Sequence, residues 1–141
     1  IAIDPKNSSI RFNIAEVLFV TEEWKKAHDM FLEIANDIPK SNMSLSRLVE
    51  FKILLCKMKM GEDDEVVILA EKYDYQDDSP YYYYVQAALA YEDEKLLEAE
   101  KWLARAKRIF RNPNTIAPWQ DTLVEYGYIK SFYGDDDPTA E

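Results

Sequence analysis

Apolar residues recur along most of the chain at intervals of three and four residues, which is the period of one helical face. One such face predicts a helix over residues 23–36 and consists of Trp24, Ala27, Phe31 and Ile34. The same spacing predicts further helices over residues 9–20, 44–60, 62–73, 80–91, 94–110 and 116–132. The chain is therefore predicted to be all-α.

Helix-breaking residues separate these segments. Pro39 follows the second predicted helix, and proline cannot continue a helix interior. Gly61 follows the third helix, as glycine commonly does just past a helix end. Pro80 and Pro118 are expected in the first turns of the helices that they open. The helices therefore pair into three hairpins and a last helix, at residues of about 8–39, 44–73, 80–111 and 116–132.

The first hairpin resembles a tetratricopeptide repeat. Pro5 and Pro39 are 34 residues apart, which is the length of one such repeat. The segment matches the repeat in order and spacing at Ile14, Ala15, Leu18, Trp24, Ala27, Phe31, Ile34 and Pro39. The resemblance implies a right-handed α-α superhelix, a solenoid of about three hairpins closed by a C-terminal capping helix. It implies one repeat domain at residues 1–134, followed by an acidic, disordered tail at residues 135–141.

Small residues recur where the paired helices are expected to cross. Ala27 and Ala99 would allow neighbouring helices to approach closely. In the second hairpin Val66 takes the place of the small alanine and Ala70 that of a large aromatic residue, so we expect a compensating exchange of volume. Val66 lies 39 residues after Ala27 and 33 residues before Ala99, which places extra length near residues 40–46.

In this repeat family the first helix of each hairpin lines a concave groove. The matching positions would form an apolar, tyrosine-rich groove for a partner, made by Phe12, Glu16, Phe19, Phe51, Leu55, Met58, Tyr81, Tyr84 and Tyr91. Interface hot spots are rich in aromatic residues, so the hypothetical anchors are Phe51, Tyr84 and Tyr91. Two alternatives stay open: several of these side chains pack as core, or the C-terminal helix folds into the groove.

Four consecutive tyrosines, Tyr81–Tyr84, open the fifth predicted helix. Successive residues of a helix point about 100° apart, so the four rings cannot all enter one core. At least one ring is expected to face solvent, the groove or a partner.

The chain has 141 residues and a formal net charge of −10. This charge repels phosphate backbones and anionic membranes, so neither nucleic-acid binding nor direct membrane contact is expected. A protein or peptide partner is compatible with it. Lys101, Arg105 and Arg108 share one face of a predicted helix. That face is expected to be solvated and paired with Glu98 and Glu100, or else to meet the acidic fourth helix or an acidic partner.

Candidate catalytic chemistry is sparse. Cys56 is the one cysteine, so it cannot form an internal disulfide, and its apolar neighbours predict a buried small hydrophobe. His28 is the one histidine and has no neighbouring ligand, which predicts a partly exposed side chain and not a metal ligand or catalytic base. The sequence contains no glycine-rich phosphate loop and no nucleophile elbow. We therefore expect no enzyme activity, cofactor or metal.

The expected function is a non-catalytic protein-interaction or scaffolding module that binds a peptide or partner helix in the groove. The alternative is a purely structural packing or self-association module of a larger multidomain protein. Ile1 to Asn7 look like the end of an earlier repeat, and the sequence does not begin with methionine. We therefore expect a piece of a longer, bacterial chain. No apolar run reaches the roughly 18 residues of a membrane span, so a soluble protein of the cytoplasm or periplasm is expected.

Overall fold

The computed structural model describes residues 8–129, and these residues form seven α-helices. The helices are α1 (Ser8–Val20), α2 (Trp24–Asp37), α3 (Met43–Lys59), α4 (Asp63–Ala70), α5 (Tyr81–Glu92), α6 (Leu96–Ile109) and α7 (Pro113–Tyr126). The all-α prediction is confirmed. All but α4 and α7 begin and end within two residues of their predicted bounds. The predicted acidic tail lies outside the described residues.

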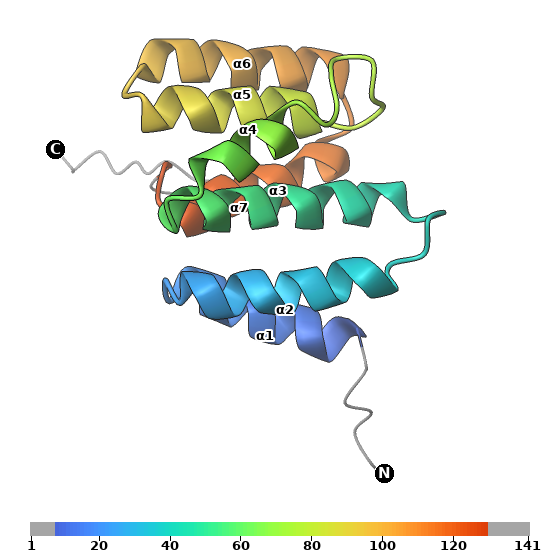
Figure 1. The fold of residues 1–141 in the computed structure, drawn as a ribbon. Helices are drawn as coiled ribbons and strands as arrows, with labels where there is room; N and C mark the ends of the chain where they lie inside the picture. Colours follow the sequence, from blue (N-terminus) through green and yellow to red (C-terminus); the bar gives the residue numbers. More distant parts are fainter. Residues whose placement is uncertain (1–7, 130–141) are drawn as a thin grey trace, which may run out of the picture. The chain divides into compact units, whose positions relative to one another are not determined.

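The chain divides into two compact units, Ile1–Glu71 and Lys72–Glu141. In the first unit each helix packs against the next, from α1 to α4. In the second unit α5 packs along α6, and α6 contacts α7. Figure 1 shows that α1 and α2, and likewise α5 and α6, run antiparallel as hairpins. A single repeat domain and a continuous superhelix stay predictions.

The core of the first unit forms where α1 and α2 cross over small residues. Ala15 of α1 and Ala27 of α2 are both fully buried. Phe31 packs edge-on against Phe12 and Phe19, with ring centroids 6.0 and 6.1 Å apart. The alanines let the two backbones approach, and the phenylalanines fill the space on either side of the contact.

Buried residues of α3 and α4 agree with the sequence prediction. Val66 and Ala70 are 6% and 9% exposed, so both positions of the expected volume exchange belong to the core. Cys56 is fully buried, and burial raises the pKa of its thiol to about 12. The thiol is therefore protonated at neutral pH and packs as the predicted small hydrophobe.

The core of the second unit consists largely of aromatic rings. Tyr81 and Tyr84 of α5 are fully buried, and the ring of Trp119 in α7 lies 6.4 and 5.7 Å from theirs. Tyr83 is buried as well, whereas Tyr82 is only partly buried. The prediction that the four consecutive rings cannot all enter the core is confirmed.

The three hairpins share one connecting turn. Its central residue has a positive φ, which is 66° at Glu22, 75° at Gly61 and 60° at Glu94. The N–H of the following residue donates to the carbonyl oxygen five residues earlier, over 2.8–3.0 Å. That following residue then accepts a hydrogen bond on its own carbonyl oxygen from the N–H groups of Ala27, Val66 and Ala99. The chain thus ends one helix in a Schellman motif and starts the next at once.

Helix α4 is shorter than predicted, because it ends at Ala70 and not near residue 73. After the helix the chain changes direction, and the ring of Tyr73 packs edge-on against Tyr81 with centroids 5.0 Å apart. Ser79 then caps α5, since its hydroxyl oxygen accepts the N–H of Tyr81 at 3.2 Å.

Helix α7 begins and ends earlier than the predicted range of 116–132. The side chain of Asn112 accepts the N–H of Asn114 at 2.9 Å, so the helix starts at Pro113. Pro118 consequently lies inside the helix, and its predicted place in the first turn is wrong. Gly127 adopts a φ of 104° and terminates the helix after Tyr126.

Candidate protein-interaction sites

The predicted groove residues divide into two sets by their burial. Five are fully buried, and these are Phe19, Phe51, Leu55, Tyr81 and Tyr84. Four are partly exposed, and these are Phe12, Glu16, Met58 and Tyr91. A fully buried ring offers no surface to a partner, so two of the three hypothetical anchors, Phe51 and Tyr84, lie in the interior. Their burial agrees with the alternative that several groove residues pack as core.

In the second unit, α7 covers the side of α5 that the sequence assigned to the groove. The Tyr84 hydroxyl donates to Oε1 of Gln120 at 3.2 Å, alongside the ring contact with Trp119. At the far end of α5, Tyr91 stacks on Tyr128 with centroids 5.0 Å apart. The Tyr128 hydroxyl donates to Oε1 of Glu92 at 2.6 Å. Here the predicted groove holds the chain's own C-terminal helix, which is the second alternative.

In the first unit, the predicted groove holds an ion pair that the sequence did not suggest. Lys52 of α3 is 2% exposed, and its Nζ lies 2.8 Å from Oε2 of Glu16 in α1. The same Nζ lies 5.2 Å from the ring centroid of Phe19 and 6.0 Å from that of Phe31. Ring faces and a carboxylate thus surround the buried ammonium. The sequence did not single out Lys52, because its partner Glu16 lies 36 residues earlier in another helix.

Phe12 is the predicted groove residue that lines an open apolar pocket. The pocket has a volume of about 340 Å³ and lies where α1, the end of α2 and the start of α3 meet. Its apolar wall is Phe12, Ile34, Ile38, Pro39 and Leu45, and its polar rim is Ser9, Asn13, Asp37 and Asn42. Rim side chains that donate or accept hydrogen bonds beside an apolar floor are typical of a site that holds one apolar side chain of a peptide.

The outward face of α1 is apolar and uncharged. The two charged residues of this helix turn toward the rest of the unit, Arg11 to pair with Asp37 and Glu16 to pair with Lys52. Ile14 and Val17 remain 44% and 61% exposed on the outward face. A helix that is apolar all round is typically covered on both sides.

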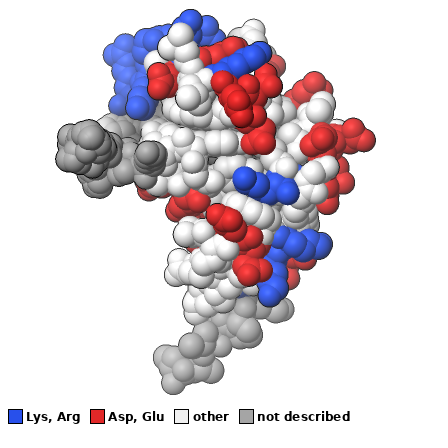
Figure 2. All heavy atoms as spheres, turned by 90° about the vertical axis from the view of Figure 1, so that its left-hand side faces the viewer, with Lys and Arg blue, Asp and Glu red and all other residues white. Residues whose placement is uncertain are grey.

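The outward face of α6 is basic. Lys101, Arg105 and Arg108 are exposed and form no ion pair with any residue of the described range 8–129. The face is solvated as expected, but its expected pairing with Glu98 and Glu100 does not form within residues 8–129. Figure 2 shows one group of blue side chains at the height at which α6 lies in Figure 1, with red side chains beside it.

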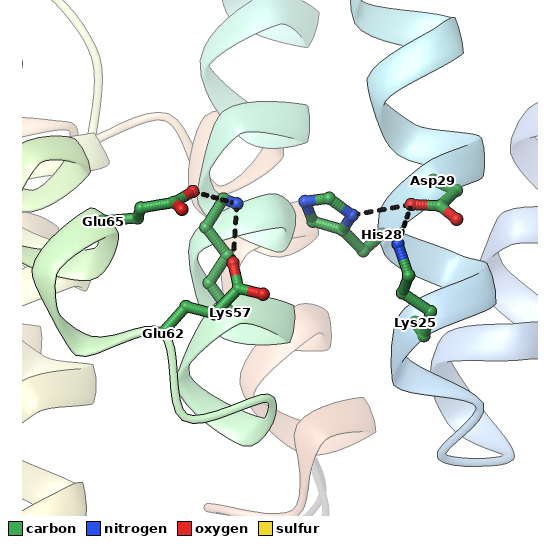
Figure 3. Close-up of polar contacts among 6 residues, drawn as sticks. All are labelled: Lys25, His28, Asp29, Lys57, Glu62 and Glu65. Atoms are coloured by element: carbon green, nitrogen blue, oxygen red, sulfur yellow. Dashed lines mark hydrogen bonds and ion pairs between the residues drawn. The ribbon is translucent and has the colours of Figure 1, made fainter.

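His28 is buried, so the predicted partly exposed position is wrong. It is the residue after Ala27 in α2, the helix that packs against α3, and its side chain has an exposed fraction of 8%. Its Nδ1 lies 3.0 Å from Oδ1 of Asp29, and its Nε2 has no hydrogen-bond partner within the described part of the chain. Figure 3 shows the ring directed toward Lys57 of α3.

Lys57 joins α3 to the start of α4. Its Nζ lies 3.2 Å from Oε1 of Glu62 and 2.5 Å from Oε1 of Glu65. Burial lowers the pKa of Lys57, but the hydrogen bonds and charges of Glu65 and Glu62 outweigh it and raise the pKa above its usual value. The same lysine lowers the pKa of Glu65. This cluster fastens α4 and is a structural feature of the first unit (Figure 3).

Within residues 8–129, no group of three or more His, Cys, Asp and Glu side chains is arranged to hold a metal ion. None of the helices described has the length and apolar character needed to cross a membrane. Comparisons of the chain with protein families, with curated proteins and with solved structures found no match.

Proposed function

We propose that the chain is a non-catalytic protein-interaction module built from helical hairpins of the tetratricopeptide type. The observation that carries this proposal is the repeated turn at Glu22, Gly61 and Glu94, with a buried Ala27, Val66 or Ala99 following each. Three connections of the same backbone geometry are what a tandem repeat requires. Chains of this architecture present side-chain surfaces for other proteins.

The pocket at Phe12 is the proposed contact point. It belongs to the first helix of the first hairpin, which is the helix that the repeat resemblance assigns to partner binding. An apolar side chain of the partner would enter the pocket, while Asn13 and Asn42 on the rim would hydrogen-bond the partner's backbone. Within the first unit, the predicted groove residues Phe19, Phe51 and Leu55 belong to the buried interior.

The test starts from a random peptide library displayed on phage and selected against the full chain. The best peptide is then titrated against the wild type, a Leu45→Glu variant and an Ile68→Glu control. Leu45 lines the pocket in the first turn of α3, where a carboxylate suits the helix dipole. Ile68 is 67% exposed on α4 and is not a pocket residue.

We expect Leu45→Glu to lower the affinity for the peptide at least about tenfold, or about 1.4 kcal/mol. Ile68→Glu should leave that affinity unchanged. Amide shifts in nuclear magnetic resonance spectra should centre on α1 and the start of α3. Equal affinities for the two variants, or selection of no peptide at all, would overturn the proposal.

A second candidate role, self-association or structural packing, is favoured by the uncharged outward face of α1. Two chains with a net charge of −10 can meet most readily where neither carries charge. Sedimentation velocity tests this role with Val17→Glu, which should convert a dimer into monomers. A wild type that is monomeric at every concentration would exclude self-association through this face.

A further inference from the structure

The outward face of α6 differs from the rest of this acidic chain. Lys101, Arg105 and Arg108 lie at positions i, i+4 and i+7 and span about 10 Å of helix. All three side chains are exposed, and none is paired with a carboxylate in the described residues. Three cations therefore lie together on a chain with a net charge of −10, with Glu94 and Glu98 near the first of them.

Aromatic contacts hold part of this face in position. The Arg105 guanidinium lies over the Trp102 ring, 4.6 Å from its centroid. Trp102 in turn packs edge-on against Tyr82, with centroids 5.7 Å apart. An arginine stacked on a fixed ring loses less side-chain freedom when it binds a carboxylate, so the face is partly preorganised.

Apolar surface adjoins the cations. Leu96 and Leu97 at the start of α6 are 60% and 68% exposed. They line an open hollow of about 600 Å³ together with Trp102, Arg105, Lys101, Lys95, Glu94 and Glu98. A ligand that fits this surface needs carboxylates for the cations and apolar side chains for the leucines.

We infer that the outward face of α6 binds an acidic peptide segment in which glutamate or aspartate alternates with leucine-like residues at helical spacing. The inference rests on the proposed interaction role but uses a surface other than the Phe12 pocket. Long-range repulsion by the net charge is screened beyond about 8 Å at physiological salt, so the local cations decide the contact. A nucleic acid would supply the negative charge but would leave the exposed leucines without an apolar partner.

The probe is a fluorescein-labelled synthetic peptide of about four helical turns, with glutamate along one face and leucine beside it. A matched peptide carries glutamine in place of each glutamate. Fluorescence anisotropy is measured with the full chain at about 150 mM salt. We expect saturable binding of the glutamate peptide, at least about tenfold tighter than that of the glutamine peptide.

Two double variants with the same change of net charge test the location. Lys101→Glu with Arg108→Glu reverses two cations of the α6 face and leaves Arg105 on Trp102. Lys26→Glu with Lys40→Glu reverses two exposed cations of the first unit. The α6 variant should lose at least about tenfold in affinity, and the control should stay within about twofold.

The outcomes separate this inference from the proposed pocket. Leu45→Glu should leave the glutamate peptide bound, because that residue belongs to the other site. Equal losses in both double variants would mean that net charge alone attracts the peptide and would overturn the inference. Tighter binding of a single-stranded oligonucleotide or of phosphatidylserine vesicles, lost in the α6 variant, would also overturn it.

Discussion

In the first unit a lysine is buried against phenylalanine rings and a glutamate, whereas in the second unit tyrosine and tryptophan rings fill the equivalent space between helices. Both units nevertheless use the same turn between antiparallel helices. The turn is made by the backbone, so it tolerates either interior. We therefore expect the stability of the first unit to depend on its buried ion pair as well as its apolar packing, and that of the second unit to depend on its ring volume.

The largest expected loss of unfolding free energy is that caused by Trp119→Ala in the second unit. Its ring is 3% exposed and touches Tyr81 and Tyr84, so removal leaves a cavity that costs about 3–5 kcal/mol of unfolding free energy. Tyr75→Ala is the control, because this ring is 64% exposed. Urea denaturation followed by circular dichroism measures both variants. A loss below about 1 kcal/mol for Trp119→Ala would show that rings do not carry this core.

The second effect is the loss of charge pairing in the first unit. Glu16→Leu removes a carboxylate from the buried Lys52 and should cost about 3 kcal/mol. Adding Lys52→Met should recover part of that loss, because an apolar pair needs no compensation for desolvation. A double-mutant cycle on unfolding free energies gives the coupling. Additive losses would mean that the two side chains act independently.

A smaller effect is expected at the shared turn. Gly61→Ala should lose about 1 kcal/mol, because a residue with a Cβ is strained at a φ of 75°. No atom lies within 4 Å of the added Cβ, so the cost is one of backbone conformation. Glu22→Gly and Glu94→Gly should gain about 0.5 kcal/mol each, since they relieve the same strain in either unit. Thermal denaturation of the three variants measures the difference, and a destabilised Glu94→Gly would contradict the common geometry.

The smallest expected effect is a dependence on pH that belongs to the first unit. Hydrogen bonds from His28 and Lys25 lower the pKa of Asp29 below its ordinary 3.8, and one from Lys57 lowers that of Glu65. A carboxyl with a lower pKa in the folded state stabilises the fold above its ordinary pKa. That contribution is lost as the pH falls through the folded value.

Urea denaturation at a series of pH values below about 5 measures this loss. Asp29→Asn with Glu65→Gln should flatten the pH profile, whereas Asp121→Asn, on the exposed side of α7, should not. A profile that is unchanged in the double variant would assign the acid sensitivity to other groups.

Local patterns in the sequence predict most of the fold. The apolar period and the residues Pro39, Gly61 and Pro80 place the first three helices, α5 and α6 to within two residues. The start of α7 was missed although Asn112 and Pro113 carry the cap and first-turn signature, because the apolar pattern begins only at Ile116. Helix caps can outweigh hydrophobic spacing at a boundary.

The candidate sites were less predictable, because they depend on pairs far apart in the sequence. Lys52 meets Glu16, and Tyr84 meets Trp119, only after the helices have packed. The His28 ring likewise is directed toward Lys57, a residue of another helix, α3 (Figure 3). A helical wheel shows which residues share a face, but it does not show which neighbour covers that face. The pocket at Phe12 also needs three elements to form.

The hydrogen bond from Tyr128 to Glu92 bears on where the C-terminus of a shortened chain can lie. It joins the last described turn of the chain to the last residue of α5. A protein ending after α6 would lose Tyr128 and also Trp119, and would uncover the sides of Tyr81, Tyr84 and Tyr91 that these rings contact. Because its aromatic surface would be exposed, such a product would be prone to aggregation and proteolysis. A C-terminal boundary chosen for expression of the second unit should therefore fall beyond Ile129.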